Sequence, residues 1–179
     1  ISTADDIKII IDNPDACPRY TARIIKGVKV GPSPQWLTER LGSIGLSSIN
    51  NIVDAANYVL MDSGHPMHTF DLNQISGNEI NVRYAKEGET FTTLDTEKRK
   101  LKDFHLLICD KKKPVALAGI MGGVNSEITI ETTDILLESA YFDPTVIRKG
   151  AKALDLSTEA SKRFERDTDI DGVIPAIDQ

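Results

Sequence analysis

A single carboxylate lies in an otherwise apolar row of a predicted strand. Residues 134–142 read DILLESAYF, and alternation puts Glu138 on one face of the strand with Leu136, Ala140 and Phe142. A carboxylate in such a row needs a partner, because burying an unpaired charge costs free energy. Glu138 is therefore a candidate for recognising a ligand. The alternatives are a solvated face or a structural hydrogen bond.

Two histidines stand close together in the segment His65-Pro66-Met67-His68. A zinc site would need a third or fourth ligand, and the only other histidine of the sequence is His105, in a predicted strand. We therefore expect no metal site here. His68 is better interpreted as a hydrogen-bond donor or a proton carrier.

The glycine-rich segment 116–123 reads ALAGIMGG. It lacks the residue order of the phosphate-binding and dinucleotide-binding glycine loops. The small residues Ala118, Gly119 and Gly122 at a strand end would instead let a flat ligand or another chain approach the backbone. We therefore interpret this segment sterically rather than as a phosphate site.

The acidic pattern Asp167-x-Asp169-x-Asp171-Gly172 matches the start of a calcium-binding loop. However, Pro175 falls inside that loop, and Asp178 stands where a bidentate glutamate is expected. Calcium is therefore kept only as an alternative. A covalent nucleophile is not indicated either, because no serine lies in the G-x-S-x-G pattern of a nucleophile elbow.

The elements that must position these residues follow from periodicity and from turn residues. Ser33 and Pro34 are a good cap and first residue for a helix that Gly45 ends. Helices lead, strands fill the middle of the chain and helices return, which favours an α+β fold over a regularly alternating one. The expected strands are 20–30, 79–84, 104–109, 115–121 and 134–142, with a loop or short strand at 67–71; the expected helices are 34–44, 49–60, one after Asp143, and one capped by Ser157 or Thr158 toward Arg166.

Composition limits the class of protein. The 179 residues are 40% hydrophobic and include two cysteines, which suits one globular module in a reducing cytosol. No apolar run approaches the roughly 20 residues needed to span a membrane. The formal charge of −6 predicts weak binding of RNA by this chain alone. The absence of an initial methionine leads us to expect that residues 1–179 are one module excised from a larger protein.

Four segments, taken in order and with their spacing, carry a family resemblance. They are INNIVDAANYVLMDSGHPMHTFD (49–71), LAGIMGGVNSEI (117–128), LLESAYFDP (136–144) and LSTEASKRFERDTD (156–169). Together they resemble the editing module of the bacterial phenylalanyl-tRNA synthetase beta chain. The likeness runs from about Tyr20 to about Asp171.

The resemblance implies a compact α+β fold of two fused subdomains, with mixed β-sheets flanked by helices. It implies hydrolytic removal of tyrosine from wrongly charged phenylalanine tRNA, in the cytoplasm and without a cofactor in this module. The parent enzyme of that family combines two alpha and two beta chains. It uses ATP and magnesium at a separate synthetic site on the alpha chain.

The resemblance also implies roles for the pocket residues. Glu138 would accept a hydrogen bond from the tyrosine hydroxyl. The three small residues of the glycine-rich segment (Ala118, Gly119 and Gly122) would keep a slot open for the ring. Asn57 and His68 would surround the amino acid and its ester.

Thr158 and Ala160 match positions that line the pocket near the terminal adenosine of the tRNA. For the hydrolysis itself, we expect a water positioned by backbone amides near Gly119 and Gly122 and by the terminal ribose. His68 would orient the ester rather than act as an obligatory base.

The chain departs from the family pattern at four positions, which are Ser47, Ala56, His65 and Asp167. These departures leave open the alternative of a scaffold that positions tRNA and has lost proofreading. A free-standing hydrolase is a further alternative, which the missing initial methionine disfavours.

Overall fold

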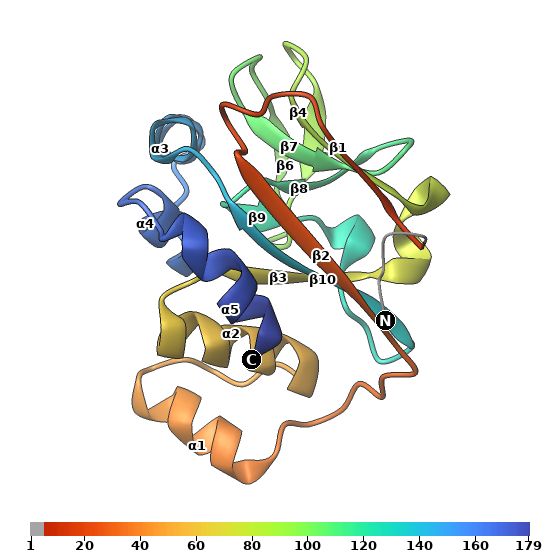
Figure 1. The fold of residues 1–179 in the computed structure, drawn as a ribbon, viewed down its shortest axis with the longest axis vertical. Coiled ribbons are helices and arrows are strands. Elements are labelled where there is room, and N and C mark those ends of the chain that lie inside the picture. Colours follow the sequence, from red (N-terminus) through yellow and green to blue (C-terminus); the bar gives the residue numbers. More distant parts are fainter. Residues whose placement is uncertain (1–5) are drawn as a thin grey trace.

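The computed structural model describes residues 6–179, so residues 1–5 of the predicted module 1–179 lie outside the described residues. The expectation of an α+β fold with mixed sheets flanked by helices is confirmed (Figure 1). Among the described residues, no helix is long and apolar enough to cross a membrane.

The strands and helices have the following bounds. The strands are β1 (Lys8–Ile11), β2 (Arg19–Lys26), β3 (Met67–Asp71), β4 (Glu79–Tyr84), β5 (Thr90–Thr92), β6 (Lys98–Lys100), β7 (Leu106–Cys109), β8 (Pro114–Leu117), β9 (Met121–Gly122) and β10 (Asp134–Tyr141). The α-helices are α1 (Gln35–Ser43), α2 (Asn51–Ser63), α3 (Pro144–Ala153), α4 (Glu159–Phe164) and α5 (Val173–Asp178).

Two main sheets build the molecule. The larger sheet has the strand order β1-β4-β7-β8-β9, in which β1 and β4 are parallel and the other neighbours antiparallel. The smaller sheet is antiparallel, with the order β2-β10-β3, and β5 and β6 form a separate hairpin. Helix α2 lies beside β3, and α5 lies against β2 and β10 (Figure 1). Apolar residues from both main sheets join in one core.

Strand β10 is the centre of the smaller sheet and is buried on both faces along its middle. Glu138 lies between Ala22 of β2 and His68 of β3 in the ladder. Its alternation neighbours Leu136 and Ala140 are buried on the same side, toward the core. Residue Ser139 points to the opposite side, where its hydroxyl donates to a backbone carbonyl of α5. The pleat therefore directs Glu138 inward.

The helical pair α1–α2 is held by Asp54, which is buried in the first turn of α2. Its carboxylate accepts hydrogen bonds from the hydroxyls of Ser33 and Ser48 and from the amide of Ile49. This arrangement corrects the prediction that Ser33 caps the first helix. The helix begins one residue later than expected, with Pro34 at its cap position, because the Ser33 side chain is bonded to Asp54 instead.

Replacing Asp54 with asparagine is expected to lower the free energy of unfolding by about 2 kcal/mol at pH 7, because hydrogen bonds to a charged acceptor contribute roughly 1.5–3 kcal/mol. Burial acts to raise the pKa of Asp54, but the hydrogen bonds from Ser33, Ser48 and Ile49 outweigh burial and lower that pKa. The stabilisation is therefore present above the unfolded-state pKa of about 3.9 and is lost as the pH falls below it.

Urea unfolding at pH 7 and pH 3 measures this difference. Asp62→Asn, on the exposed surface of α2, is the matched control. Equal stability of Asp54→Asn and the wild type at pH 7 would contradict the prediction.

The glycine-rich segment differs most from the sequence-based expectation. The single strand predicted over 115–121 is two short strands, β8 and β9, joined by a turn at residues 118–120. The turn forms because Gly119 has a φ of +65°, a left-handed conformation that strand residues do not adopt. His105 lies just before β7 rather than in a strand, and the last predicted helix ends at Phe164.

Candidate functional site

Two adjoining cavities open between the smaller sheet and the β8–β9 hairpin. The inner cavity has a volume of about 60 Å³ and the outer cavity about 450 Å³. Both cavities are lined by Met67, His68, Ile120, Met121, Gly122 and Ala160. Of the other predicted site residues, Glu138 and Gly119 line the inner cavity, and Asn57 and Thr158 line the outer one.

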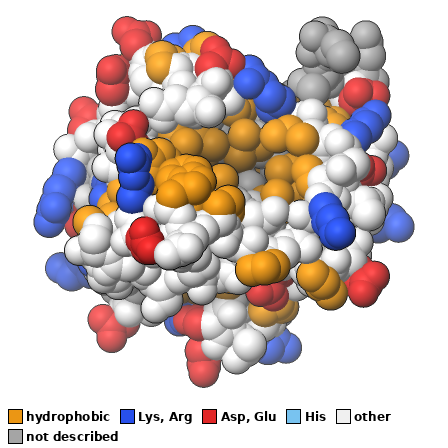
Figure 2. Space-filling view, turned by 90° about the horizontal axis from the view of Figure 1, so that it is seen from below, with side chains coloured by type: hydrophobic (Ala, Val, Ile, Leu, Met, Phe, Trp, Pro, Cys, Tyr) orange, Lys and Arg blue, Asp and Glu red, His pale blue; other side chains and the backbone are white. Residues whose placement is uncertain are grey.

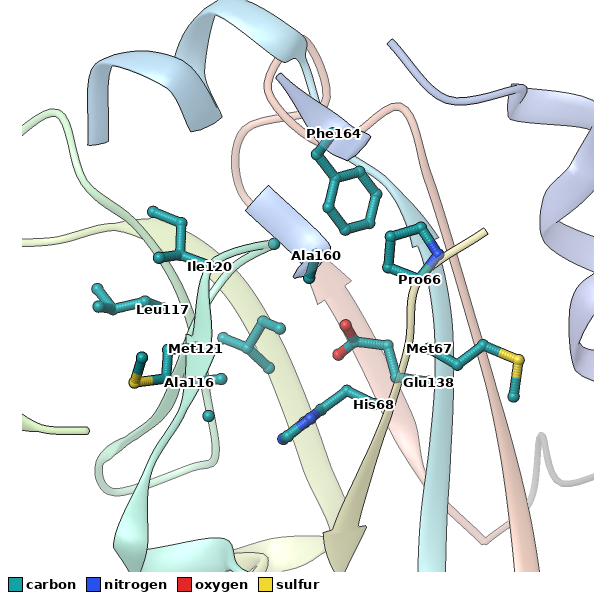
Figure 3. A pocket seen from close by; sticks show the side chains of 13 residues that line it. Pro66, Met67, His68, Ala116, Leu117, Ile120, Met121, Glu138, Ala160 and Phe164 are labelled. Carbon is teal, nitrogen blue, oxygen red and sulfur yellow. The ribbon is translucent and has the colours of Figure 1, made fainter. Parts of the chain in front are cut away.

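Glu138 lies at the wall of the inner cavity and is only 6% exposed. Its carboxylate points from β10 toward the β8–β9 hairpin (Figure 3). Its Oε2 accepts a hydrogen bond of 2.6 Å from the hydroxyl of Tyr20. Burial raises the pKa of Glu138 to about 7, and the bond from Tyr20 acts in the opposite direction. The carboxylate is thus a buried acceptor facing an otherwise apolar recess.

His68 lines both cavities. Its ring points from β3 toward the hairpin, next to Glu138 (Figure 3), and it packs edge-on against Phe70 with ring centroids 4.5 Å apart. Burial lowers the pKa of His68 to about 4, so the ring is neutral at physiological pH. A neutral imidazole can donate or accept a hydrogen bond but carries no charge to offer a reacting ester.

The hairpin provides the opposite wall of the inner cavity. A side chain at Gly119 would begin 3.0 Å from the Phe164 ring, and one at Gly122 would begin 2.6 Å from the ring of His68. The amide of Gly119 makes no hydrogen bond with residues 6–179, and Gly119 lines the inner cavity. Ala118, predicted to line the slot, lines neither cavity, because it is fully buried and donates its amide to Leu106.

The outer cavity brings α2 and the start of α4 together. Asn57 has no side-chain hydrogen bond with residues 6–179, so its amide is available to a ligand. The hydroxyl of Thr158 donates to the Ile120 carbonyl at 2.8 Å and accepts from the Ser161 amide at 3.0 Å. Thr158 therefore caps α4 and fixes it to the hairpin, and Ala160 on the same helix lines both cavities.

The surface around α1 and α2 is apolar. Figure 2 shows hydrophobic side chains gathered around a hollow on the face that carries these helices. Large exposed hydrophobic side chains of this region are Trp36, Ile44 and Ile49, and Ile49 also lines the outer cavity. The rim of the outer cavity can therefore accept a planar apolar group.

The inner cavity is too small for an aromatic ring in this conformation. A cavity of about 150 Å³ holds one benzene molecule, whereas the inner cavity measures about 60 Å³. A ring can enter only if lining side chains move, and Met67 and Met121 are the flexible ones among them. Binding of a ring thus requires local rearrangement.

The calcium-like aspartates have other partners. The Tyr141 hydroxyl donates to Asp167 at 2.8 Å, Asp169 caps a short 3-10 helix, and Asp171 pairs with Arg19 at 3.5 Å. Within residues 6–179, no group of three or more metal-ligating side chains is placed to hold an ion.

Tyr20 was not among the site residues predicted from the sequence; it marked only the approximate start of the family resemblance. Tyr20 is opposite Ala140 in the β2–β10 ladder, two positions from Glu138 along β10 and on the same face of the sheet. Alternation within residues 20–30 could have placed Tyr20 on an inward face. The pairing of β2 with β10 was the information that the sequence did not supply.

Comparison with known proteins gives the family. Residues 16–179 match the B3/4 domain. The phenylalanine–tRNA ligase beta subunits of Geobacter metallireducens and Protochlamydia amoebophila are each 53% identical to this chain, over 100% and 98% of its length. The chain spans about a fifth of these relatives, because the match covers 22% of each.

A solved structure has a similar fold. An N-terminal fragment of the phenylalanyl-tRNA synthetase beta-subunit from Pyrococcus horikoshii matches 86% of this chain and 48% of that chain, with a TM-score of 0.57 and 13% identity. At this identity the likeness concerns the fold alone. The family match extends over almost all of the described residues, and the chain therefore belongs to the B3/4 domain family.

Proposed function

We propose that this chain is the proofreading site of a phenylalanine–tRNA ligase beta subunit, where tyrosine is hydrolysed from wrongly charged phenylalanine tRNA. The observation that supports this most is Glu138, a buried carboxylate at the wall of a small apolar cavity that adjoins a larger one. The inner cavity would take the tyrosine ring, and the outer cavity the ester and the terminal adenosine.

The need for such a site follows from the two amino acids. Tyrosine differs from phenylalanine by one hydroxyl, and an apolar synthetic pocket rejects an added hydroxyl only about a hundredfold. A site that hydrogen-bonds the hydroxyl works in the opposite sense, because phenylalanine would leave the buried acceptor unpaired. Glu138 is an acceptor of this kind.

Hydrolysis needs a water aligned with the ester carbonyl. We infer that the amide of Gly119, which lines the inner cavity, and the side chain of Asn57, which lines the outer one, orient the water and the ester. The terminal ribose of the tRNA would complete the arrangement. This route needs neither a metal nor a covalent intermediate.

The larger assembly is part of the same proposal. The chain carries a formal charge of −6, so other parts of a longer protein would hold the tRNA. An alpha chain, in a tetramer of two alpha and two beta chains, would carry the synthetic site with its ATP and magnesium in the cytoplasm.

The test is deacylation of phenylalanine tRNA charged with tyrosine or with phenylalanine, by the full-length protein. Rapid clearance of the tyrosyl ester with the phenylalanyl ester spared is the expected result. Failure to clear either ester above the spontaneous rate would contradict the proposal and favour the alternative of a tRNA-positioning scaffold.

His68→Ala is expected to slow deacylation of the tyrosyl ester by less than about tenfold. Burial lowers the pKa of His68 to about 4, which makes the ring a weak base at physiological pH, and we therefore propose that its contribution is orientation of the ester. General-base catalysis would contribute about a hundredfold or more. Single-turnover deacylation measures the effect, and complete loss with unchanged tRNA binding would contradict the orienting role.

A further inference from the structure

Tyr20 is the side chain that holds the carboxylate of Glu138 through a hydrogen bond. Among residues 6–179, its hydroxyl is the only donor to the Glu138 carboxylate, at 2.6 Å. Tyr20 does not line either cavity, so it would not touch a bound ring. Any effect of Tyr20 on recognition must therefore pass through Glu138.

We propose that Tyr20 is a positioning residue for recognition of the substrate hydroxyl: it occupies Oε2 of Glu138 and leaves Oε1 as the acceptor for the ligand. This inference rests on the proposed function. The roles are possible together because an ionised carboxylate accepts several hydrogen bonds through its two oxygens.

The ladder makes this contact specific. Tyr20 and Glu138 are diagonal neighbours on one face, since Tyr20 pairs with Ala140 and Glu138 pairs with Ala22. Ala22 carries only a methyl group beside the carboxylate, so the longer Tyr20 side chain reaches across the diagonal. The contact fixes one rotamer of Glu138 and so directs its second oxygen.

The contact with Tyr20 also affects the ionisation of Glu138. The titratable groups facing Glu138 are Tyr20 and Cys17 on the side of β2 and His68 on β3. The β8–β9 hairpin and α4 contribute only uncharged side chains to the inner cavity. The Tyr20 hydroxyl is thus the group that favours the ionised, accepting form of Glu138, against burial.

Tyr20→Phe removes the hydroxyl and keeps the ring. In the full-length protein, the preference for the tyrosyl over the phenylalanyl ester is expected to fall about tenfold at pH 7 and to recover only in part by about pH 8.5. Raising the pH restores the ionised form, because a bond to a charged acceptor shifts a carboxyl pKa by about one unit or more, but it does not restore the rotamer that directs Oε1. Tyr141→Phe is the matched control, because Tyr141 lies on β10, the strand of Glu138, and its hydroxyl is bonded to the exposed carboxylate of Asp167 instead. An unchanged preference in Tyr20→Phe at pH 7, or a full recovery of the preference at pH 8.5, would overturn the positioning role.

A second measurement does not depend on hydrolysis. The carboxyl ¹³C resonance of Glu138 is followed against pH in the 179-residue chain, whose sheets share one core. Tyr20→Phe should raise the titration midpoint, and 3-fluorotyrosine at position 20, a stronger donor, should lower it. Midpoints that do not move in these directions overturn the role of Tyr20. If they move but neither ester is hydrolysed by the full-length wild type, only the proposed function fails.

Discussion

Replacing Glu138 with alanine is expected to slow hydrolysis of the tyrosyl ester roughly 100-fold and to leave slow hydrolysis of the phenylalanyl ester almost unchanged. The tyrosine hydroxyl would lose a charged acceptor worth about 1.5–3 kcal/mol and would itself be left unpaired in a buried recess. A loss of about 2.8 kcal/mol corresponds to a hundredfold in rate. Deacylation of both esters by the full-length protein measures the change.

Glu131→Ala is the control for Glu138→Ala, because Glu131 is an exposed carboxylate that lines neither cavity. The preference of the wild type for tyrosine should also grow as the pH rises through about 7, where Glu138 ionises, and this dependence should vanish in Glu138→Ala. Equal clearance of tyrosine by the wild type and Glu138→Ala would show that Glu138 is not the recognition group.

The substitution Gly122→Ala is expected to slow deacylation of both esters by roughly 100-fold without changing the preference between them. The added methyl would lie 2.6 Å from two atoms of the His68 ring, which must then move into a cavity that it now borders. Unlike removal of the ring, its displacement would fill space that the ester and the water need, and a displacement of about 1 Å at a reacting centre can cost about a hundredfold. Overpacking should also lower the free energy of unfolding by about 1–3 kcal/mol.

Gly42→Ala is the control for Gly122→Ala, since a methyl group at Gly42 would meet nothing within 4 Å. Thermal unfolding separates the two effects of the substitution at Gly122. If Gly122→Ala hydrolyses both esters at the wild-type rate, then the narrow contact with His68 does not matter for the reaction.

The sequence was sufficient to predict the inward side of β10. Alternation placed Glu138 with Leu136 and Ala140, and the structure shows these three residues buried together. The inward face of the strand could be predicted because the alternation of side chains between the two faces is a local property of the chain. The α+β class was predictable for the same reason, since the order of helices and strands depends on local periodicity.

The contacts that organise the site were not predictable in this way. The bond between Tyr20 and Glu138 joins residues 118 positions apart, and the pairing of strands over such distances is not a local signal. The Ser33–Asp54 bond likewise overrode a favourable local cap. The turn at Gly119 could not be predicted from the sequence, because the apolar residues around it suit a buried strand and a buried turn equally well.

The small volume of the inner cavity has a thermodynamic consequence for the proposed proofreading. If only a small fraction of molecules is open to a ring, the apparent dissociation constant of every aminoacyl ester is raised by the inverse of that fraction. This factor is the same for tyrosine and phenylalanine and leaves their ratio unchanged. It does, however, move the apparent dissociation constant of the weaker ligand, the phenylalanyl ester, further above the concentration at which that ester is present. A cavity of about 60 Å³ at rest would therefore act as an affinity threshold that protects the correct product from hydrolysis.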